Sequence, residues 1–211
     1  MDWLIAGLSK KEKRELLADL NYLNTGEIKA FCKKHGIPCR IAVETKDDGW
    51  KKTNEDDRKG VMLNRVRHFL RTGRVLPETR FRSAVVCFEA IPEELAARDR
   101  LFYGRYDKRN RAVMGLLKEL TGGEFADGAI ARILAREYWS RGEAPTFQEY
   151  AAAWLMTRKE HRKPNAEWAY LSDLAGKRNV AEWKKMRARK AKEVMKTIGK
   201  IRAGARENPE T

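Results

Sequence analysis

Apolar residues recur every three or four positions through most of the chain, a spacing that predicts α-helices. Near the start, Ile28, Phe31 and Cys32 fall on one helical face. Asn24 and Glu27 precede them with the spacing of a capping box, in which each side chain accepts a bond from the other residue's backbone N–H. The pattern therefore predicts a helix that begins after Asn24.

The pattern changes after this helix. Gly36 suits a left-handed C-terminal cap, and Pro38 blocks any continuation. Residues 39–52 read CRIAVETKDDGWKK, an apolar run followed by a turn that contains glycine, which predicts a small β-hairpin. A helical pattern resumes over residues 54–73, where acids at the start complement the helix dipole and Met62 lies on the buried side.

Residues 75–92 have no helical period and are expected to form an extended connector that contains a domain boundary. The helical pattern returns at Pro92, a residue that suits a first helical turn. Further helices are expected to begin after the capping residues Asn110, Asp127, Thr146, Asn165 and Asn179. The last of these helices has a narrow apolar stripe, and Lys and Arg cover its other sides.

These elements predict a mainly α fold in three consecutive parts. Residues 1–80 would form a helix–loop–helix module with a preceding helix and the small hairpin insert. Residues 92–160 would form a helical domain, and residues 161–211 a basic helical region that ends in one long helix.

The charge is large and uneven. The 211 residues include 45 Lys and Arg against 30 Asp and Glu, a net charge of +15. Residues 151–211 hold 16 cations against 7 acids, whereas residues 101–150 hold 8 against 7. This balance favours an anionic partner, nucleic acid above all. The alternative is a protein whose Lys and Arg side chains are simply solvated.

Two segments, LNTGEIKAFCKKHGIP (residues 23–38) and RKGVMLNRVRHFL (residues 58–70), together resemble a SAP module. In that family an apolar first helix ends in a Gly–hydrophobic–Pro-like turn, as at Gly36–Pro38. The second helix begins with basic residues and carries a K-x-x-L-I-x-R-L pattern, matched here by Arg58, Lys59, Met62, Leu63, Arg65 and Val66. The sequence departs from the family in the connecting loop, which has 19 residues here.

The resemblance implies docking on duplex DNA. The start of the second helix would offer free backbone N–H groups to a phosphate, with basic side chains beside them. The cations expected to contact DNA, in the module and in the basic C-terminal helix, are Lys29, Lys33, Lys34, Arg40, Lys51, Lys52, Arg58, Lys59, Arg65, Lys184, Lys185, Arg189 and Lys192.

The middle part, from residue 101 to residue 154, resembles a bacterial domain of unknown function that occurs beside SAP-like modules. That resemblance implies no activity. The aromatic residues of this part could stack on bases, but their helical spacing favours a place in the core. These residues are Tyr138, Trp139, Phe147, Tyr150 and Trp154. A protein partner is the alternative task for this domain.

Two cysteines and a histidine lie close together near the helix stop. Cys32, His35 and Cys39 could bind zinc with Cys87 or His68 as a fourth ligand. The interpretation as a metal site is disfavoured, because Cys32 and His35 lie on an apolar helical stripe and paired C-x-x-C motifs are absent. The sequence also has no phosphate loop, catalytic Ser/His/Asp set or H-E-x-x-H motif, so we expect no cofactor and no enzyme activity.

The apolar run WLIAGL at residues 3–8 is too short to span a membrane and has no basic segment before it, so neither a span nor a signal peptide is expected. Three cysteines, an odd number, favour a reducing cytoplasm. The sequence thus predicts a non-enzymatic, cytoplasmic, nucleoid-associated bacterial protein that binds duplex DNA. A protein–protein adaptor and an RNA-binding protein are the alternatives.

Overall fold

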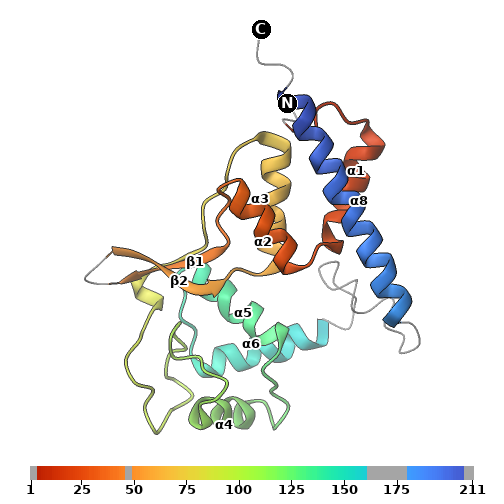
Figure 1. The fold of residues 1–211 in the computed structure, drawn as a ribbon. Coiled ribbons are helices and arrows are strands. Elements are labelled where there is room, and N and C mark those ends of the chain that lie inside the picture. The colour runs from red at the N-terminus through yellow and green to blue at the C-terminus, as the bar shows by residue number, and fades with distance from the viewer. Residues whose placement is uncertain (1–3, 46–48, 161–179, 207–211) are drawn as a thin grey trace. The chain divides into compact units, whose positions relative to one another are not determined.

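The computed structural model describes residues 4–45, 49–160 and 180–206 (Figure 1). The fold is mainly α with a small three-stranded sheet, in agreement with the predicted fold class. The helix expected after Asn165 lies outside the described residues, as does the capping residue Asn179.

The chain forms two compact units, and each is built from separate segments. Unit 1 comprises residues 1–39, 57–77 and 164–211, and unit 2 comprises residues 40–56 and 78–163. This division differs from the three consecutive parts that the sequence predicts. The hairpin belongs to unit 2, and the long C-terminal helix belongs to unit 1, because its apolar stripe packs on the N-terminal helices.

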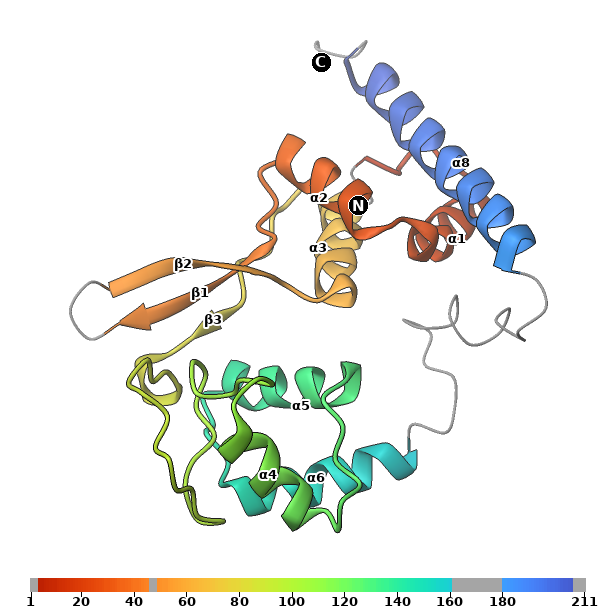
Figure 2. The same cartoon turned by 60° about the horizontal axis from the view of Figure 1, so that its bottom comes forward.

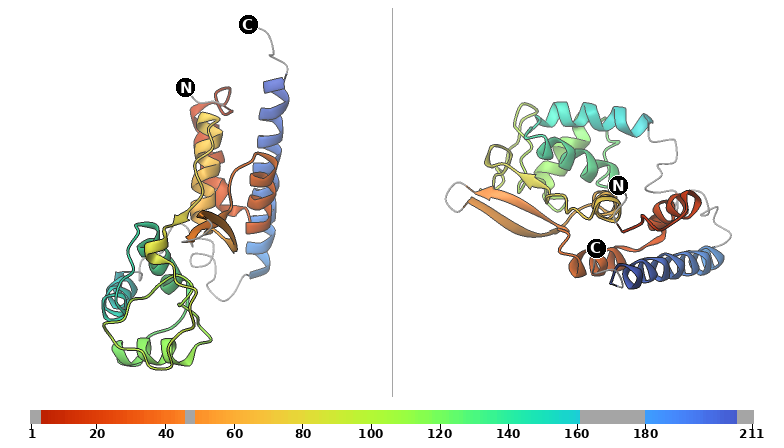
Figure 3. Two further views of the ribbon diagram at one scale, coloured as in Figure 1. Left: turned by 90° about the vertical axis from the view of Figure 1, so that its left-hand side faces the viewer. Right: turned by 90° about the horizontal axis from the view of Figure 1, so that it is seen from above.

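The described elements of unit 1 are all helical. They are α1 (Lys10–Asp19), the 3₁₀ turn η1 (Leu20–Tyr22), α2 (Thr25–Lys34), α3 (Lys59–Thr72) and α8 (Val180–Arg206). Helix α8 packs against α1 and η1, as Figures 1 and 3 show, although more than 150 residues separate them in the sequence. The buried core of this unit comprises Ile5, Leu16, Leu20, Leu23, Ile28, Phe31, Cys32, Ile37, Met62, Leu63, Val66, Leu70, Ala191, Val194 and Ile198.

Unit 2 combines the sheet with three helices. Its elements are β1 (Arg40–Thr45), β2 (Gly49–Asp56), β3 (Arg80–Phe81), the 3₁₀ turn η2 (Ser83–Val85), α4 (Arg111–Leu120), α5 (Ala129–Ser140) and α6 (Phe147–Glu160). Strand β1 lies between β2, which is antiparallel to it, and β3, which is parallel to it (Figure 2). The expected connector thus contains a strand that completes the sheet.

The aromatic residues of the middle domain form the core of unit 2, as their helical spacing predicts. Trp139, Phe147, Tyr150 and Trp154 are buried, and Tyr138 is half-buried against them. The Tyr150 hydroxyl donates to a backbone carbonyl of α5 at 2.7 Å, and the Trp139 indole N–H donates to a loop carbonyl at 2.9 Å. These rings are therefore not available to stack on bases.

The capping residues predicted from the sequence are mostly confirmed. Reciprocal capping boxes begin α2 at Asn24 and α6 at Thr146 as predicted, and a further capping box at Ser9 begins α1. The Asn110 side chain caps α4. The prediction for Asp127 is wrong, because Gly128 caps α5 without a side-chain bond and the Asp127 carboxylate instead accepts the Tyr106 hydroxyl at 2.7 Å.

The turn after α2 ends the helix as predicted. Gly36 has a positive φ of 66°, which glycine adopts without strain. The Ile37 N–H donates back to the Cys32 carbonyl at 2.9 Å and closes the last turn. The sequence HGIP is thus a helix stop.

The predicted hairpin is confirmed as strands β1 and β2, and its two ends meet in unit 1. The Asp57 N–H donates to the Cys39 carbonyl at 2.7 Å. Residues 39–57 therefore leave the pair of helices α2 and α3 and return to it at one point. Because residues 39 and 57 are in contact, the end of α2 and the start of α3 are as close together as a short turn would place them.

Candidate nucleic-acid interface

Helix α8 is held in unit 1 by one side. Its buried stripe consists of Ala191, Val194 and Ile198. Two cations flank this stripe and are used for packing. The Arg187 guanidinium pairs with the Glu27 carboxylate, and the Lys190 ammonium lies 2.8 Å from an Asp19 carboxylate oxygen. This acceptor raises the pKa of Lys190 above its usual value.

The opposite side of α8 carries a stripe of exposed cations. Lys185, Arg189, Lys192 and Lys196 follow one another at spacings of four, three and four residues, so at 100° per residue they share the face opposite the buried stripe. We call these four residues the α8 basic stripe. Glu193 approaches it only at the edge, 3.9 Å from Arg189. No hydrogen bond or ion pair joins Lys185, Lys192 or Lys196 to the described part of the chain.

Most of the cations predicted for DNA contact in unit 1 are exposed. Lys29 and Lys33 lie one turn apart on the solvent side of α2, and Lys34 follows them at its C-terminal end. In α8, Lys184 is exposed but lies about 100° round the helix from Lys185, outside the α8 basic stripe. The sequence-based selection omitted Lys196, although the four-residue spacing from Lys192 places it on the same face.

The backbone and the basic side chains at the start of α3 already have partners within the protein. Arg58 and Lys59 are half-buried, and the Lys59 ammonium donates to the Asn21 carbonyl at 2.6 Å. The Asp57 carboxylate accepts the Arg58 backbone N–H at 3.1 Å. A negative group therefore already lies at the helix N-terminus, at the place where the predicted DNA contact requires a phosphate.

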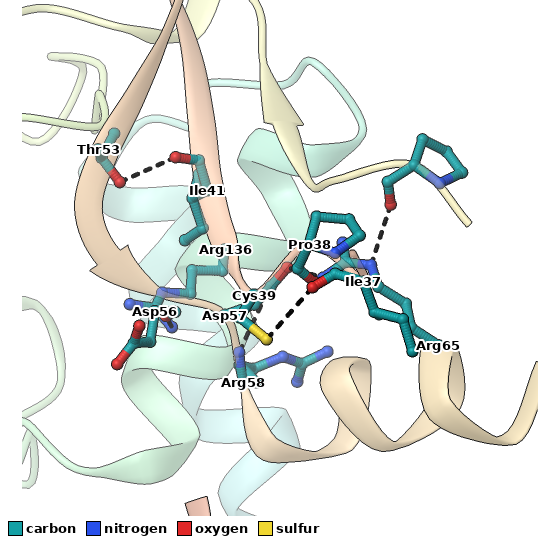
Figure 4. A network of polar contacts seen from close by, with 11 residues as sticks. Ile37, Pro38, Cys39, Ile41, Thr53, Asp56, Asp57, Arg58, Arg65 and Arg136 are labelled. Atoms are coloured by element: carbon teal, nitrogen blue, oxygen red, sulfur yellow. Dashed lines mark hydrogen bonds and ion pairs between the residues drawn. The ribbon is translucent and has the colours of Figure 1, made fainter. Parts of the chain in front are cut away.

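Arg65 does not belong to any exposed surface. It is 4% exposed and pairs with the buried Asp57 at 2.8 Å. Its guanidinium also donates to the carbonyls of Pro38 and Pro77 at 3.1 and 2.9 Å (Figure 4). The expectation that Arg65 contacts DNA does not fit this burial. Arg65 instead joins the ends of the hairpin insert to the segment that follows α3.

The three cations predicted in the hairpin are exposed but do not form one surface. Arg40 lies at the start of β1, next to an irregularity in the strand pairing. Lys51 and Lys52 are neighbours in β2 and therefore point to opposite faces of the sheet. A single ligand surface can use one of the two lysines, but not both.

The cysteines and histidine near the helix stop are packed into unit 1. The His35 ring lies between the rings of Phe31 and Phe69, with centroid distances of 4.4 and 4.8 Å. Burial first, and a side-chain hydrogen bond with Cys39 second, raise the pKa of the Cys32 thiol to about 12. The described residues contain no group of three or more potential metal ligands.

Unit 2 contains an open cavity of about 550 Å³. Its lining includes Tyr103, whose pKa is raised to about 12 by burial first and by the Glu55 carboxylate second. Arg136 in the same lining pairs with Glu55 at 2.8 Å. Three acidic and three basic side chains line the cavity, so it adds no cationic patch to the interface. These side chains are Glu55, Asp107, Asp127, Lys108, Arg132 and Arg136.

Three comparisons with known proteins found no similar protein. A scan against protein-family models, a search of curated proteins and a search of solved structures each found no match. Within the described ranges, no helix has the length and apolar character needed to cross a membrane.

Proposed function

We propose that the protein binds nucleic acid, with duplex DNA as its main ligand, and that the α8 basic stripe makes the principal phosphate contacts. The observation that supports this proposal most directly is the separation of cations on α8. Arg187 and Lys190 are used to hold the helix, whereas Lys185, Lys192 and Lys196 are left to solvent.

The length of the stripe fits a phosphate backbone. Residues 185–196 span about 16 Å at 1.5 Å per residue. That distance corresponds to roughly five phosphates of one strand of B-DNA at 3.4 Å per phosphate along the axis. A helix that is anchored by its opposite side presents these cations with little loss of backbone entropy on binding.

The exposed lysines of α2 support the same function. Lys29 and Lys33 lie on the helix of the SAP-like segment and point away from the core. They add positive potential to unit 1, which steers an anionic ligand toward it. The resemblance to SAP modules supports duplex DNA as the form of nucleic acid, rather than RNA.

A salt titration tests the proposal. Binding to labelled duplex DNA, single-stranded DNA and RNA is measured between about 50 and 200 mM salt, the range over which phosphate contacts strongly change affinity. The variant Lys185→Ala/Lys192→Ala/Lys196→Ala should lower the magnitude of the duplex log–log slope by up to about 2.7, at about 0.9 per lost contact. The substituted side chains are exposed, so the fold should be retained.

A charge-matched variant controls for general electrostatics. Lys108→Ala/Arg111→Ala/Lys118→Ala removes the same three charges from exposed positions of unit 2. Equal losses in the two triple variants would show that only the net charge matters. Absence of binding to all three nucleic acids would reject the proposal and favour the adaptor function.

A further inference from the structure

The sheet of unit 2 has one face in the core. Lys51 pairs with Val43 across β2 and β1, and Val43 pairs with Phe81 across β1 and β3. Cross-strand partners share a face, and Val43 and Phe81 are buried among the helices of this unit. The side chains of the alternate positions therefore point away from that core.

The alternate positions carry a different set of residues. Lys52 pairs with Ala42, and Ala42 pairs with Arg80, so these three side chains share the second face. Trp50 pairs with Glu44 on the same face. The Glu44 carboxylate is turned to the start of η2, where it accepts the backbone N–H of Ser83 at 2.9 Å.

Trp50 is an unusual residue for this position. It is 40% exposed on β2, which is an edge strand with no buried residue. The Arg80 guanidinium lies 5.0 Å from the centroid of its ring. Arg82, two residues further in extended chain, is exposed as well. We call Trp50, Lys52, Arg80 and Arg82 the sheet platform.

We propose that the sheet platform binds an unpaired base of single-stranded DNA, which stacks on Trp50 while Lys52 and Arg82 bind the adjacent phosphates. This inference rests on the proposed nucleic-acid function and adds a second, structurally separate ligand form to it. Aromatic rings beside cations are the usual means of binding single strands, because every base has a π-face that an aromatic ring can cover.

Two features favour a nucleic-acid base over an apolar protein partner. The platform has a single large apolar group and three cations, whereas a protein interface core is depleted in charge. Of these cations, Arg80 is paired with Glu78 at 3.4 Å. Lys52 and Arg82 are left for phosphates. Arg80 also holds the Trp50 ring in place before a ligand arrives, so little side-chain entropy is lost on stacking.

The test compares single-stranded oligothymidylate with duplex DNA by fluorescence anisotropy. Trp50→Ala should lower the affinity for the single strand by about 5- to 150-fold, the range for loss of one base stack, and leave the salt slope unchanged. Trp50→Phe should restore part of the affinity. Phe88→Ala is the matched control, because Phe88 is 62% exposed in the same unit but lies outside the platform.

Lysine variants test which face is used. Lys52→Ala should lower the magnitude of the single-strand slope by about 0.7, whereas Lys51→Ala, from the other face, should not. The inference is overturned if Trp50→Ala binds the single strand as the wild type does, or if Phe88→Ala loses as much. Wild-type binding to duplex alone would overturn it and leave the proposed function intact, whereas no binding to either form would reject both.

Discussion

Removal of Asp57 should strongly destabilise unit 1. Asp57 is 5% exposed, and its carboxylate lies 2.8 Å from the Arg65 guanidinium and accepts the Arg58 N–H at the start of α3. In Asp57→Ala the guanidinium of Arg65 stays buried without its anion. Breaking a buried pair by removal of one partner costs about 3–5 kcal/mol, a large share of the 5–15 kcal/mol that typically stabilises a protein.

A second ion pair in the protein provides the control. Glu55 and Arg136 also lie 2.8 Å apart, but their side chains are 49% and 23% exposed. Glu55→Ala should therefore cost at most about 1 kcal/mol. The two variants differ in burial and in the bond from the Arg58 N–H to Asp57, and the desolvated charge accounts for the larger part of the expected difference.

Hydrogen exchange read by mass spectrometry suits this measurement, because peptides of α2 and α3 report on unit 1 separately from those of α4–α6. Asp57→Ala should lower the opening free energy in α2 and α3 and leave α4–α6 close to wild type. The double variant Asp57→Leu/Arg65→Met should recover most of the loss, since no charge is then buried. A loss below about 1 kcal/mol, or no recovery in the double variant, would refute the reasoning.

Three further predictions concern single residues. Cys32, protonated below its raised pKa of about 12, should resist maleimide at pH 8, whereas the half-buried Cys39 and Cys87 should react; labelling followed by peptide mass spectrometry checks this. Gly104→Ala should destabilise unit 2, because φ is +94° and the new Cβ would lie 2.3 Å from a backbone carbonyl oxygen, and a lowered melting temperature would show it. Tyr150→Phe should cost about 0.5–1.5 kcal/mol in urea unfolding through loss of its 2.7 Å hydrogen bond, and an unchanged midpoint would contradict this.

The caps, the helix stop and the hairpin were predicted from the sequence because their causes are local. Two local predictions are wrong: no helix follows Pro92 in the described chain until α4 begins at Arg111, and the helix expected from residue 54 begins only at Lys59, because residues 54–56 belong to β2. The cap at Asn24 depends on a residue three positions away, and the stop at Gly36 on its own φ. The hairpin follows from a short apolar run and a turn. Each of these signals is complete within a window of about ten residues.

The arrangement of the elements was not predicted, because it depends on contacts between distant residues. The apolar stripe of α8 could have packed on any partner, and only the structure shows that it packs on α1 and η1. Arg65 was assigned to DNA as one more cation of a basic motif. Arg65 follows the buried Met62 by three residues, and this helical spacing places it at the edge of the apolar face, where a side chain can be buried.

The sheet platform was missed for a related reason. The sequence pattern places Trp50 only next to a turn, although two lysines follow it directly. Its contact with Arg80 depends on a parallel strand that brings Arg80 to the same face from 30 residues further along the chain. The cations exposed on α8 could be predicted, because opposite faces of a helix follow from spacing alone.

The pairing of α8 with α1 also sets the order in which the protein can be completed during synthesis. Lys190 and Asp19 are in contact but lie 171 positions apart. At about 5–20 residues per second, α1 leaves the ribosome roughly ten to thirty seconds before its partner helix is made. Unit 2 can finish folding in that interval, while Leu16 of α1 and Leu20 of η1 lack the part of their apolar core that α8 supplies. A translating ribosome paused before α8 thus displays an exposed apolar surface, the kind of surface that chaperones bind.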